Sequence, residues 1–182
     1  MSTAPEEVLD YWFNEVGADN WFASSPERDQ EITKRFLEDH ERAAGGGMSA
    51  WEDTPTGMLS LMLLLDQFPR HMFRNTPRAF ATDDAALELA RTGIIKHFDD
   101  RIGTSYKLCF YLPFAHSENM GDQRLALFYI RERTKHPVWL GHAEHNYNTV
   151  LRFGHFPERN KILGRPSTAA EEEYLKQPLV EF

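Results

Sequence analysis

The chain has 182 residues, of which 26% are charged and 41% are hydrophobic. A chain of this length buries about 70% of its surface on folding, which is enough for one hydrophobic core. The composition excludes a largely disordered protein and predicts a single domain over residues 1–182. The 28 acidic and 20 basic residues give a net charge of −8. This charge argues against a nucleic-acid partner, because such proteins usually carry an excess of basic residues.

The charge is unevenly distributed along the chain. Residues 1–66 contain 14 acidic and 4 basic residues, whereas residues 67–182 contain 14 acidic and 16 basic residues. A surface that binds an anion is therefore expected in the second part of the chain.

Apolar residues recur at helical spacing along nearly the whole chain, starting with a helix that Pro5 opens. Ser25-Pro26 opens a second helix, which ends at the glycines of residues 45–47. A third helix follows Thr54-Pro55. Its run from Met58 to Leu65 is apolar on almost every side, which is typical of a helix at the centre of a core.

Five further helices are predicted. Thr82 and the two aspartates after it cap the fourth. The others cover about residues 104–114, 119–135, 137–154 and 167–176. No segment alternates like a strand, and no Asn-Gly or Asp-Gly hairpin turn occurs. The sequence therefore predicts an all-α protein of about eight or nine helices without a sheet.

Cys109 is the one cysteine, so an internal disulfide and a Cys-rich zinc site are both excluded. Its apolar neighbours favour a small buried side chain over a reactive thiol. The longest apolar run, Leu61 to Leu65, is far short of the ~20 residues that span a bilayer. Acidic residues stand near the start of the chain, where a signal peptide would have basic ones. We expect a soluble cytoplasmic protein that does not bind membranes.

The first of four polar clusters lies at the end of the third helix. Pro69 lacks an amide N–H, so the helix should break or kink there and leave carbonyl groups near Leu65 and Asp66 without partners. Arg70 and Arg74 are spaced by four, and Asp66 is placed to pair with Arg70. These arginines either tie down the end of a buried helix or form a site for an anion or carboxylate.

The second cluster lies between the fifth and sixth helices. Asn119 with Asp122 is similar to a capping box, and acidic residues are favoured at a helix start. Capping does not explain His116. Together with Glu118 and Asp122, this histidine suggests metal ligands, an acid–base pair or a polar binding site. Gln123 completes the cluster.

The third and fourth clusters lie on the seventh helix and in the segment after it. His142, His145 and Arg152 share one stripe of that helix, which either lines a cleft or holds hydrogen-bonded histidines in partial burial. The zinc motif His-Glu-x-x-His is absent. The next segment, residues 152–168, has an excess of basic residues and contains three further candidates. It either contributes to a site or caps the last helix. These candidates are His155, Arg159 and Asn160.

Several ordered motifs resemble the bacterial domain-of-unknown-function family 924. The resemblance covers nearly the full chain and implies an all-α fold similar to tetratricopeptide-like superhelices, with no established activity. With the helical periodicity, it predicts a right-handed superhelical array of antiparallel helix pairs. The motifs are Val8-Leu9-Asp10-Tyr11-Trp12-Phe13 with Trp21-Phe22, Leu65-Asp66-Gln67-Phe68-Pro69-Arg70 with Phe73-Arg74, Arg78-Ala79-Phe80, Pro113-Phe114 with His116-Ser117-Glu118 and Asp122-Gln123, Arg152-Phe153-Gly154-His155-Phe156-Pro157 with Arg159-Asn160, and Leu163-Gly164-Arg165 with Ser167-Thr168 and Glu171-Glu172.

Three prolines, Pro69, Pro113 and Pro157, lie 44 residues apart. This interval is the length of an α-solenoid unit, although even spacing can also arise by chance. Alternate helices of an up-down array run parallel, so the helix ends near these prolines would meet at one rim. We therefore predict one polar cluster of Asp66, Arg70, His116, Arg152 and His155, with Glu118, Asp122, Gln123, Arg159 and Asn160 at its edge.

Two functions are consistent with such a cluster. The favoured one is a binding module whose polar groove receives an anionic small molecule or a peptide carboxylate, because arginine makes bidentate bonds to these groups. The alternative is a hydrolase- or lyase-type enzyme without a cofactor. Its base would be a histidine oriented by a carboxylate. No metal or cofactor is predicted, and the oligomeric state is left open. The catalytic candidates are His116, His142, His155, Asp66 and Glu118, and the binding candidates are Asp66, Arg70, Arg74, His116, Glu118, Asp122, Gln123, His142, His145, Arg152, His155, Arg159 and Asn160.

Overall fold

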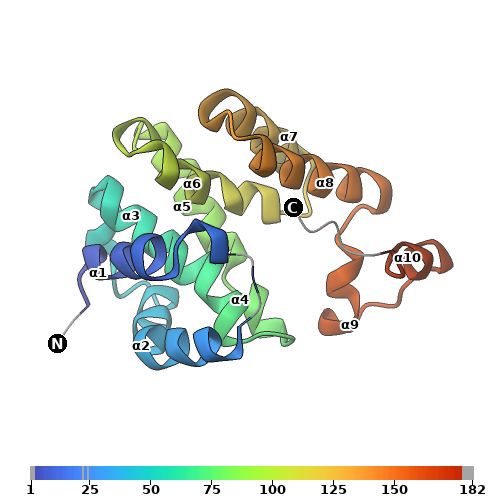
Figure 1. Cartoon of the computed structure of the whole chain (residues 1–182), viewed down its shortest axis with the longest axis horizontal. Coiled ribbons are helices and arrows are strands. Elements are labelled where there is room, and N and C mark those ends of the chain that lie inside the picture. Colours follow the sequence, from blue (N-terminus) through green and yellow to red (C-terminus); the bar gives the residue numbers. More distant parts are fainter. Residues whose placement is uncertain (1–2, 22, 24, 178–182) are drawn as a thin grey trace.

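The computed structural model describes residues 3–21, 23 and 25–177, and throughout these ranges the regular structure is helical, without a strand (Figure 1). The predicted all-α fold is confirmed for this part of the chain. A π-helical segment, η4 (Leu63–Gln67), joins α3 to α4, so ten α-helical segments form nine continuous helices. The segments are α1 (Pro5–Asp10), α2 (Pro26–Ala44), α3 (Pro55–Met62), α4 (Phe68–Met72), α5 (Asp83–Ile95), α6 (Thr104–His116), α7 (Met120–Tyr129), α8 (Pro137–Phe153), α9 (Asn160–Leu163) and α10 (Ala169–Tyr174).

Most helix starts follow the capping residues in the sequence. Ser25 and Thr54 each accept a hydrogen bond from a backbone N–H in the first turn of α2 and α3. Asn119 caps α7 in the same way, and Thr168 forms a full capping box at α10. Thr82 precedes α5 as predicted, but its hydroxyl does not cap that helix. At Ser25, Thr54, Asn119 and Thr168, the side-chain oxygen satisfies N–H groups that have no partner within the helix.

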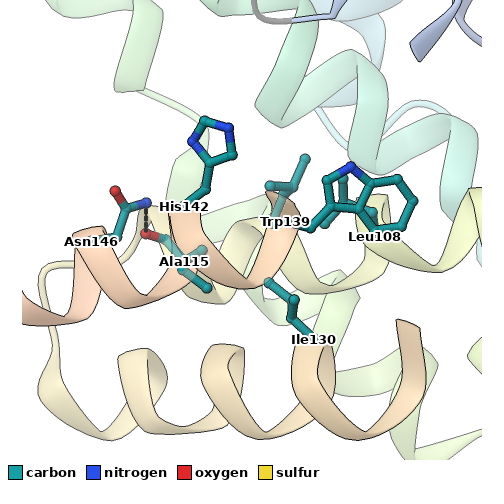
Figure 2. A pocket seen from close by; sticks show the side chains of 8 residues that line it. Leu108, Ala115, Ile130, Trp139, His142 and Asn146 are labelled. Carbon is teal, nitrogen blue, oxygen red and sulfur yellow. Dashed lines mark hydrogen bonds between the residues drawn. The ribbon is translucent and has the colours of Figure 1, made fainter. Parts of the chain in front are cut away.

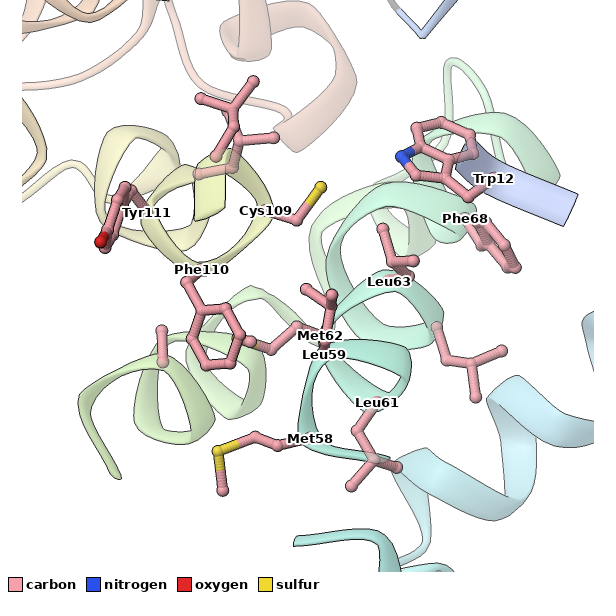
Figure 3. Close-up of a cluster of buried hydrophobic side chains, with 14 of the residues drawn as sticks. Trp12, Met58, Leu59, Leu61, Met62, Leu63, Phe68, Cys109, Phe110 and Tyr111 are labelled. Carbon is pink, nitrogen blue, oxygen red and sulfur yellow. The ribbon is translucent and has the colours of Figure 1, made fainter. Parts of the chain in front are cut away.

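Helix α3 and η4 lie in the centre of the core, as their sequence predicts. Every residue from Gly57 to Gln67 is buried. Figure 3 shows this helix between Trp12 and Phe68 on one side and Phe110 on the other. Cys109 is 3% exposed in the same cluster, and burial raises the pKa of its thiol. The structure therefore confirms a small buried side chain at this position.

Of the break or kink predicted at Pro69, the break does not occur. The helix changes to π-helical hydrogen bonding at Leu63–Gln67 and continues as α4 through Pro69 to Met72. The missing N–H still leaves carbonyl groups to be satisfied, as expected. The carbonyl of Leu65 accepts the hydroxyl of Thr82 at 2.5 Å, and that of Asp66 accepts Nη1 of Arg70 at 2.5 Å. Tertiary hydrogen bonds thus replace the helical ones.

Pro113 likewise lies inside a helix, so α6 ends at His116 rather than near Phe114. Helices that are neighbours in sequence pack together from α5 through α8, as an array of helix pairs requires. The right-handed, tetratricopeptide-like twist stays a prediction that is compatible with this packing. α9 and α10 lie beyond the end of α8, at one side of the molecule (Figure 1). The ends of the predicted domain, residues 1–2 and 178–182, lie outside the described ranges.

Candidate functional site

His116, the last residue of α6, contacts a carboxylate at the end of the central helix. Its Nδ1 lies 2.7 Å from Oδ1 of Asp66. Asp66 is 1% exposed and also accepts a hydrogen bond from the side chain of Gln67. An anionic acceptor at Nδ1 selects the tautomer that carries its proton there, so Nε2 presents a lone pair. In the described part of the chain, that Nε2 has no hydrogen-bond partner.

Two arginines surround this histidine–aspartate pair. Nη1 of Arg70 lies 3.3 Å from Oδ1 of Asp66, and its guanidinium also makes two bonds to Asp83, of 2.8 and 2.9 Å. Arg159 donates from Nη2 to the backbone carbonyl of His116 at 2.9 Å, and its Nη1 lies 3.6 Å from Asp83. Four segments of the chain (η4/α4, α5, α6 and the turn before α9) therefore meet at this point.

A second histidine–aspartate pair lies next to the first. Nδ1 of His71 in α4 is 2.8 Å from Oδ1 of Asp29 in α2. Arg74 donates to the same carboxylate from Nε at 2.6 Å and from Nη2 at 2.8 Å. The spacing of four between Arg70 and Arg74 places both on one face of the helix end. Each arginine therefore has a carboxylate behind it.

The two pairs open onto one pocket of about 190 Å³. The pocket has a polar wall, which comes from η4, α4 and the end of α6, and an apolar wall from the segment between α1 and α2. The three aspartates lie behind the polar wall and do not line the pocket. The lining residues are Trp21, Ala23, Gln67, Arg70, His71, Arg74 and His116.

Burial sets the ionisation of the pocket. It lowers the pKa of His116 because a buried imidazolium is disfavoured, and the charge of Arg70 lowers that pKa further, against the opposing effect of Asp66. Burial also lowers the pKa of His71, with Asp29 opposing it. Burial alone would raise the pKa of Asp66, but Arg70 and His116 hold it below its usual range. Near neutral pH, the pocket therefore has neutral histidines, and Asp66 behind them is ionised.

Glu118 connects this site to the C-terminal segment. It makes two bonds to the guanidinium of Arg165, of 2.7 and 2.9 Å, and accepts the backbone N–H of Phe156 at 2.9 Å. These bonds hold the pKa of Glu118 below its usual value although burial opposes the shift. Glu118 thus fastens residues 156–165 beside the site, and Arg159 completes the attachment.

Asp122, Gln123 and Asn160 take structural positions next to the cluster. Asp122 pairs with Arg91 of α5 and accepts the hydroxyl of Ser117. Gln123 donates to the carbonyls of Ala115 and Ser117 at the end of α6, and Asn160 donates to the Ser167 hydroxyl. These contacts satisfy buried polar groups at helix ends, as buried polar side chains usually do.

Other candidates do not join the cluster. Arg152 is exposed, with its guanidinium over the ring of Phe153. His145 contacts the hydroxyl of Tyr174, and His155 pairs with Glu171 of α10 at 2.7 Å. The predicted convergence thus holds for Asp66, Arg70 and His116, but not for Arg152 or His155. Both lie around the end of α8, and their contacts are with that helix or α10.

His142 belongs to a different cavity, which is small and mostly apolar (Figure 2). It measures about 20 Å³ and lies between α6, α7 and α8. Asn146 donates there to the carbonyl of Ala115 at 3.1 Å. Figure 2 shows His142 and Trp139 on α8 above this cavity. A cavity of this size has room for about one water molecule.

Sequence reasoning missed several residues of the site. Asp29 was not among the candidates, and Asp83 looked like a helix-capping acid. His71 was passed over between the two arginines, and Trp21 appeared only within a family motif. Asp29 and His71 are 42 residues apart, so no local pattern pairs them. An acid beside the narrow apolar stripe of α2 was the one available signal.

Comparison with known proteins identifies the family. The chain belongs to the family described as bacterial protein of unknown function (DUF924), whose profile matches residues 8–179. A solved structure of a protein of unknown function from Agrobacterium tumefaciens is 36% identical, with a TM-score of 0.90. That match covers 94% of this chain and 96% of the other. No curated protein matches the chain.

Two properties of the described residues narrow the kind of site further. No helix in the described ranges has both the length and the apolar character needed to cross a bilayer. Nor do three histidine, cysteine, aspartate or glutamate side chains come together there in a way that would hold a metal ion.

Proposed function

We propose that the pocket beside Asp66 and His116 binds a small organic anion. The observation that carries this proposal is the arrangement of its walls: two guanidinium groups and two imidazoles face the pocket, while their carboxylate partners lie behind them. Guanidinium N–H groups that are held in place in this way are suited to a carboxylate or phosphate oxygen. A peptide carboxylate offers the same end group.

The size of the pocket favours a small molecule. At about 190 Å³, it is smaller than the ≈300–1,000 Å³ that is typical of pockets for drug-sized ligands. Trp21 and Ala23 add an apolar wall opposite the charged groups. A ligand with one anionic end and a short apolar part fits a pocket with one charged wall and one apolar wall. A cytoplasmic location and a single-domain organisation belong to the same proposal.

Thermal unfolding with a panel of small carboxylates and inorganic phosphate tests the proposal. A ligand that binds the folded state alone, at 100 times its Kd, stabilises that state by about 2.7 kcal/mol. We expect His116→Gln to remove this stabilisation and His142→Gln, at the other cavity, to retain it. If no anion raises the unfolding temperature, or if both variants respond like the wild type, the pocket is not an anion site.

A second function, acid–base catalysis, is favoured by one observation. His116 lines the pocket and is held by Asp66 at Nδ1, and its Nε2 has no partner among the described residues, which is the arrangement of a general base. In a hydrolysis reaction, Nε2 would accept a proton from a water molecule as that water attacks. Turnover of small ester substrates, lost in His116→Gln, would support this alternative. Binding without turnover would favour the binding module.

A further inference from the structure

The charges around the pocket decide which kind of anion it would bind. The inference drawn from them rests on the proposed function. Three guanidinium groups stand close to the pocket, and each pairs with an aspartate. Arg74 pairs with Asp29, whereas Arg70 and Arg159 both contact Asp83, and Arg70 also contacts Asp66. The three guanidinium groups therefore face three aspartates, and a neutral His116 and His71 add no positive charge. A bare anion would enter a site without net positive charge.

We infer that the pocket takes a small monocarboxylate together with one proton, which His116 accepts at Nε2. With a lone pair on Nε2, His116 repels a carboxylate oxygen. A proton from solvent forms a new N–H bond there, so that His116 becomes a cationic donor. Asp66, at 2.7 Å from Nδ1, stabilises the imidazolium. The complex then holds carboxylate and imidazolium and has no net charge beyond that of the empty site.

Charged groups from four elements surround His116, and some favour its protonation while others oppose it. Asp66 from η4 and Asp83 from α5 favour its protonation, whereas Arg70 from α4 and Arg159 from the turn at Pro157–Arg159 oppose it. Burial and Arg70 keep this imidazole neutral in the empty pocket, so a ligand carboxylate next to Nε2 adds the negative charge that favours its protonation. Ligand and proton therefore bind cooperatively, each strengthening the other.

His71 is less suited to hold the proton. Its carboxylate partner, Asp29, already accepts two short hydrogen bonds from Arg74, and Nη2 of Arg74 lies 3.3 Å from Nδ1 of His71. The positive charge of Arg74 is thus close to the imidazole of His71 and opposes a second positive charge there. At His116, the contact between Arg70 and Asp66 is longer, at 3.3 Å, than the 2.7 Å contact between His116 and Asp66.

A single proton compensates a single negative charge, so a monoanion is preferred over a dianion. The apolar wall of Trp21 and Ala23 distinguishes further between monoanions. It favours a carboxylic acid with a short apolar or aromatic part over a fully polar anion such as inorganic phosphate. The substrate class assigned to the pocket is therefore a small apolar monocarboxylic acid.

Isothermal titration calorimetry with benzoate, in HEPES and in Tris buffer, measures the proton directly. The two buffers absorb different amounts of heat on giving up a proton, so the difference in binding enthalpy gives the number of protons taken up. We expect about one proton per benzoate above pH 7, and an affinity that falls about tenfold per pH unit there. Benzamide, which is neutral, should bind without proton uptake, and inorganic phosphate should bind more weakly than benzoate.

The His116→Gln variant should show no proton uptake, whereas His142→Gln should behave like the wild type. Benzoate binding to the wild type without proton uptake overturns the inference and leaves the anion site intact. Uptake that persists in His116→Gln also overturns it. The absence of binding by benzoate and phosphate even near pH 6 overturns the proposed function itself. The number of protons taken up is measured on the wild-type chain, so this test remains valid even if the variant fails to fold.

Discussion

Arg70 holds Asp83 with two parallel hydrogen bonds of 2.8 and 2.9 Å while it also contacts Asp66. One guanidinium thus compensates two poorly exposed carboxylates. Arg70→Ala should therefore lower the free energy of unfolding by about 3 kcal/mol, because it leaves buried charge without a partner. Of the two roles that the sequence left open for Arg70, this result would show the structural one.

Urea denaturation of Arg70→Ala and Arg152→Ala measures this difference. Arg152 is exposed, so its replacement should change stability by no more than about 0.5 kcal/mol. Equal effects of the two substitutions would contradict the structural role given to Arg70.

Thr82 satisfies the carbonyl of Leu65, which Pro69 leaves without its helical partner. Thr82→Val keeps the shape of the side chain but removes the hydroxyl, so we expect a loss of about 1 kcal/mol in the free energy of unfolding. Thr76→Val is the matched control, since the Thr76 hydroxyl bonds to the carbonyl of Phe73 at an exposed site. Chemical denaturation that gives the control the larger loss would show that water satisfies Leu65 equally well.

Gly93 lies where α5 packs against α6 and the central helix. A Cβ added there would lie 2.6 Å from a ring carbon of Phe110 and 2.7 Å from the sulfur of Met58. We expect Gly93→Ala to destabilise the protein by about 1–3 kcal/mol through overpacking. Gly45→Ala, whose Cβ would meet its nearest atom at 3.4 Å, should change stability far less in the same denaturation experiment. A stabilised Gly93→Ala variant would mean that the core is looser than described.

Stability should depend on pH through the buried histidines. Burial lowers the pKa of His40, His71 and His116 in the folded chain, so the unfolded chain binds more protons once the pH falls below about 6.5. The free energy of unfolding is therefore expected to decrease between about pH 7 and pH 5.5. His40→Gln should reduce this slope, since it removes one of these groups. Urea titrations at several pH values measure it, and a stability that rises on acidification would refute the assignment.

The sequence predicted much of the fold because its signals are local. Proline at the first helical position, capping side chains and apolar spacing locate most helix starts to within a residue or two, as at Pro26 and Pro137. The joining of α3 to α4 was missed, because it depends on Thr82 and Arg70 binding the carbonyls that Pro69 leaves open. Local patterns do not report such tertiary partners.

The site was predicted in part for the same reason. Asp66, Arg70 and His116 stand out because each follows an apolar helix and none is explained by capping. Arg152 shares that pattern but lies on an exposed face of α8, which the sequence pattern did not distinguish from a face that lines a cleft. Asp29 lies 45 residues from Arg74, so only the packing of α2 against α4 reveals it.

Nitrogen-15 NMR of the histidine side chains during a benzoate titration tests the pocket most directly. The His116 signals, assigned by their absence in His116→Gln, should move from the neutral toward the imidazolium position as benzoate binds, because Nε2 gains a proton. The His142 signals, from a separate cavity, should not move. Saturable binding of benzoate that leaves the His116 signals unchanged would contradict the assignment of this pocket as the ligand site.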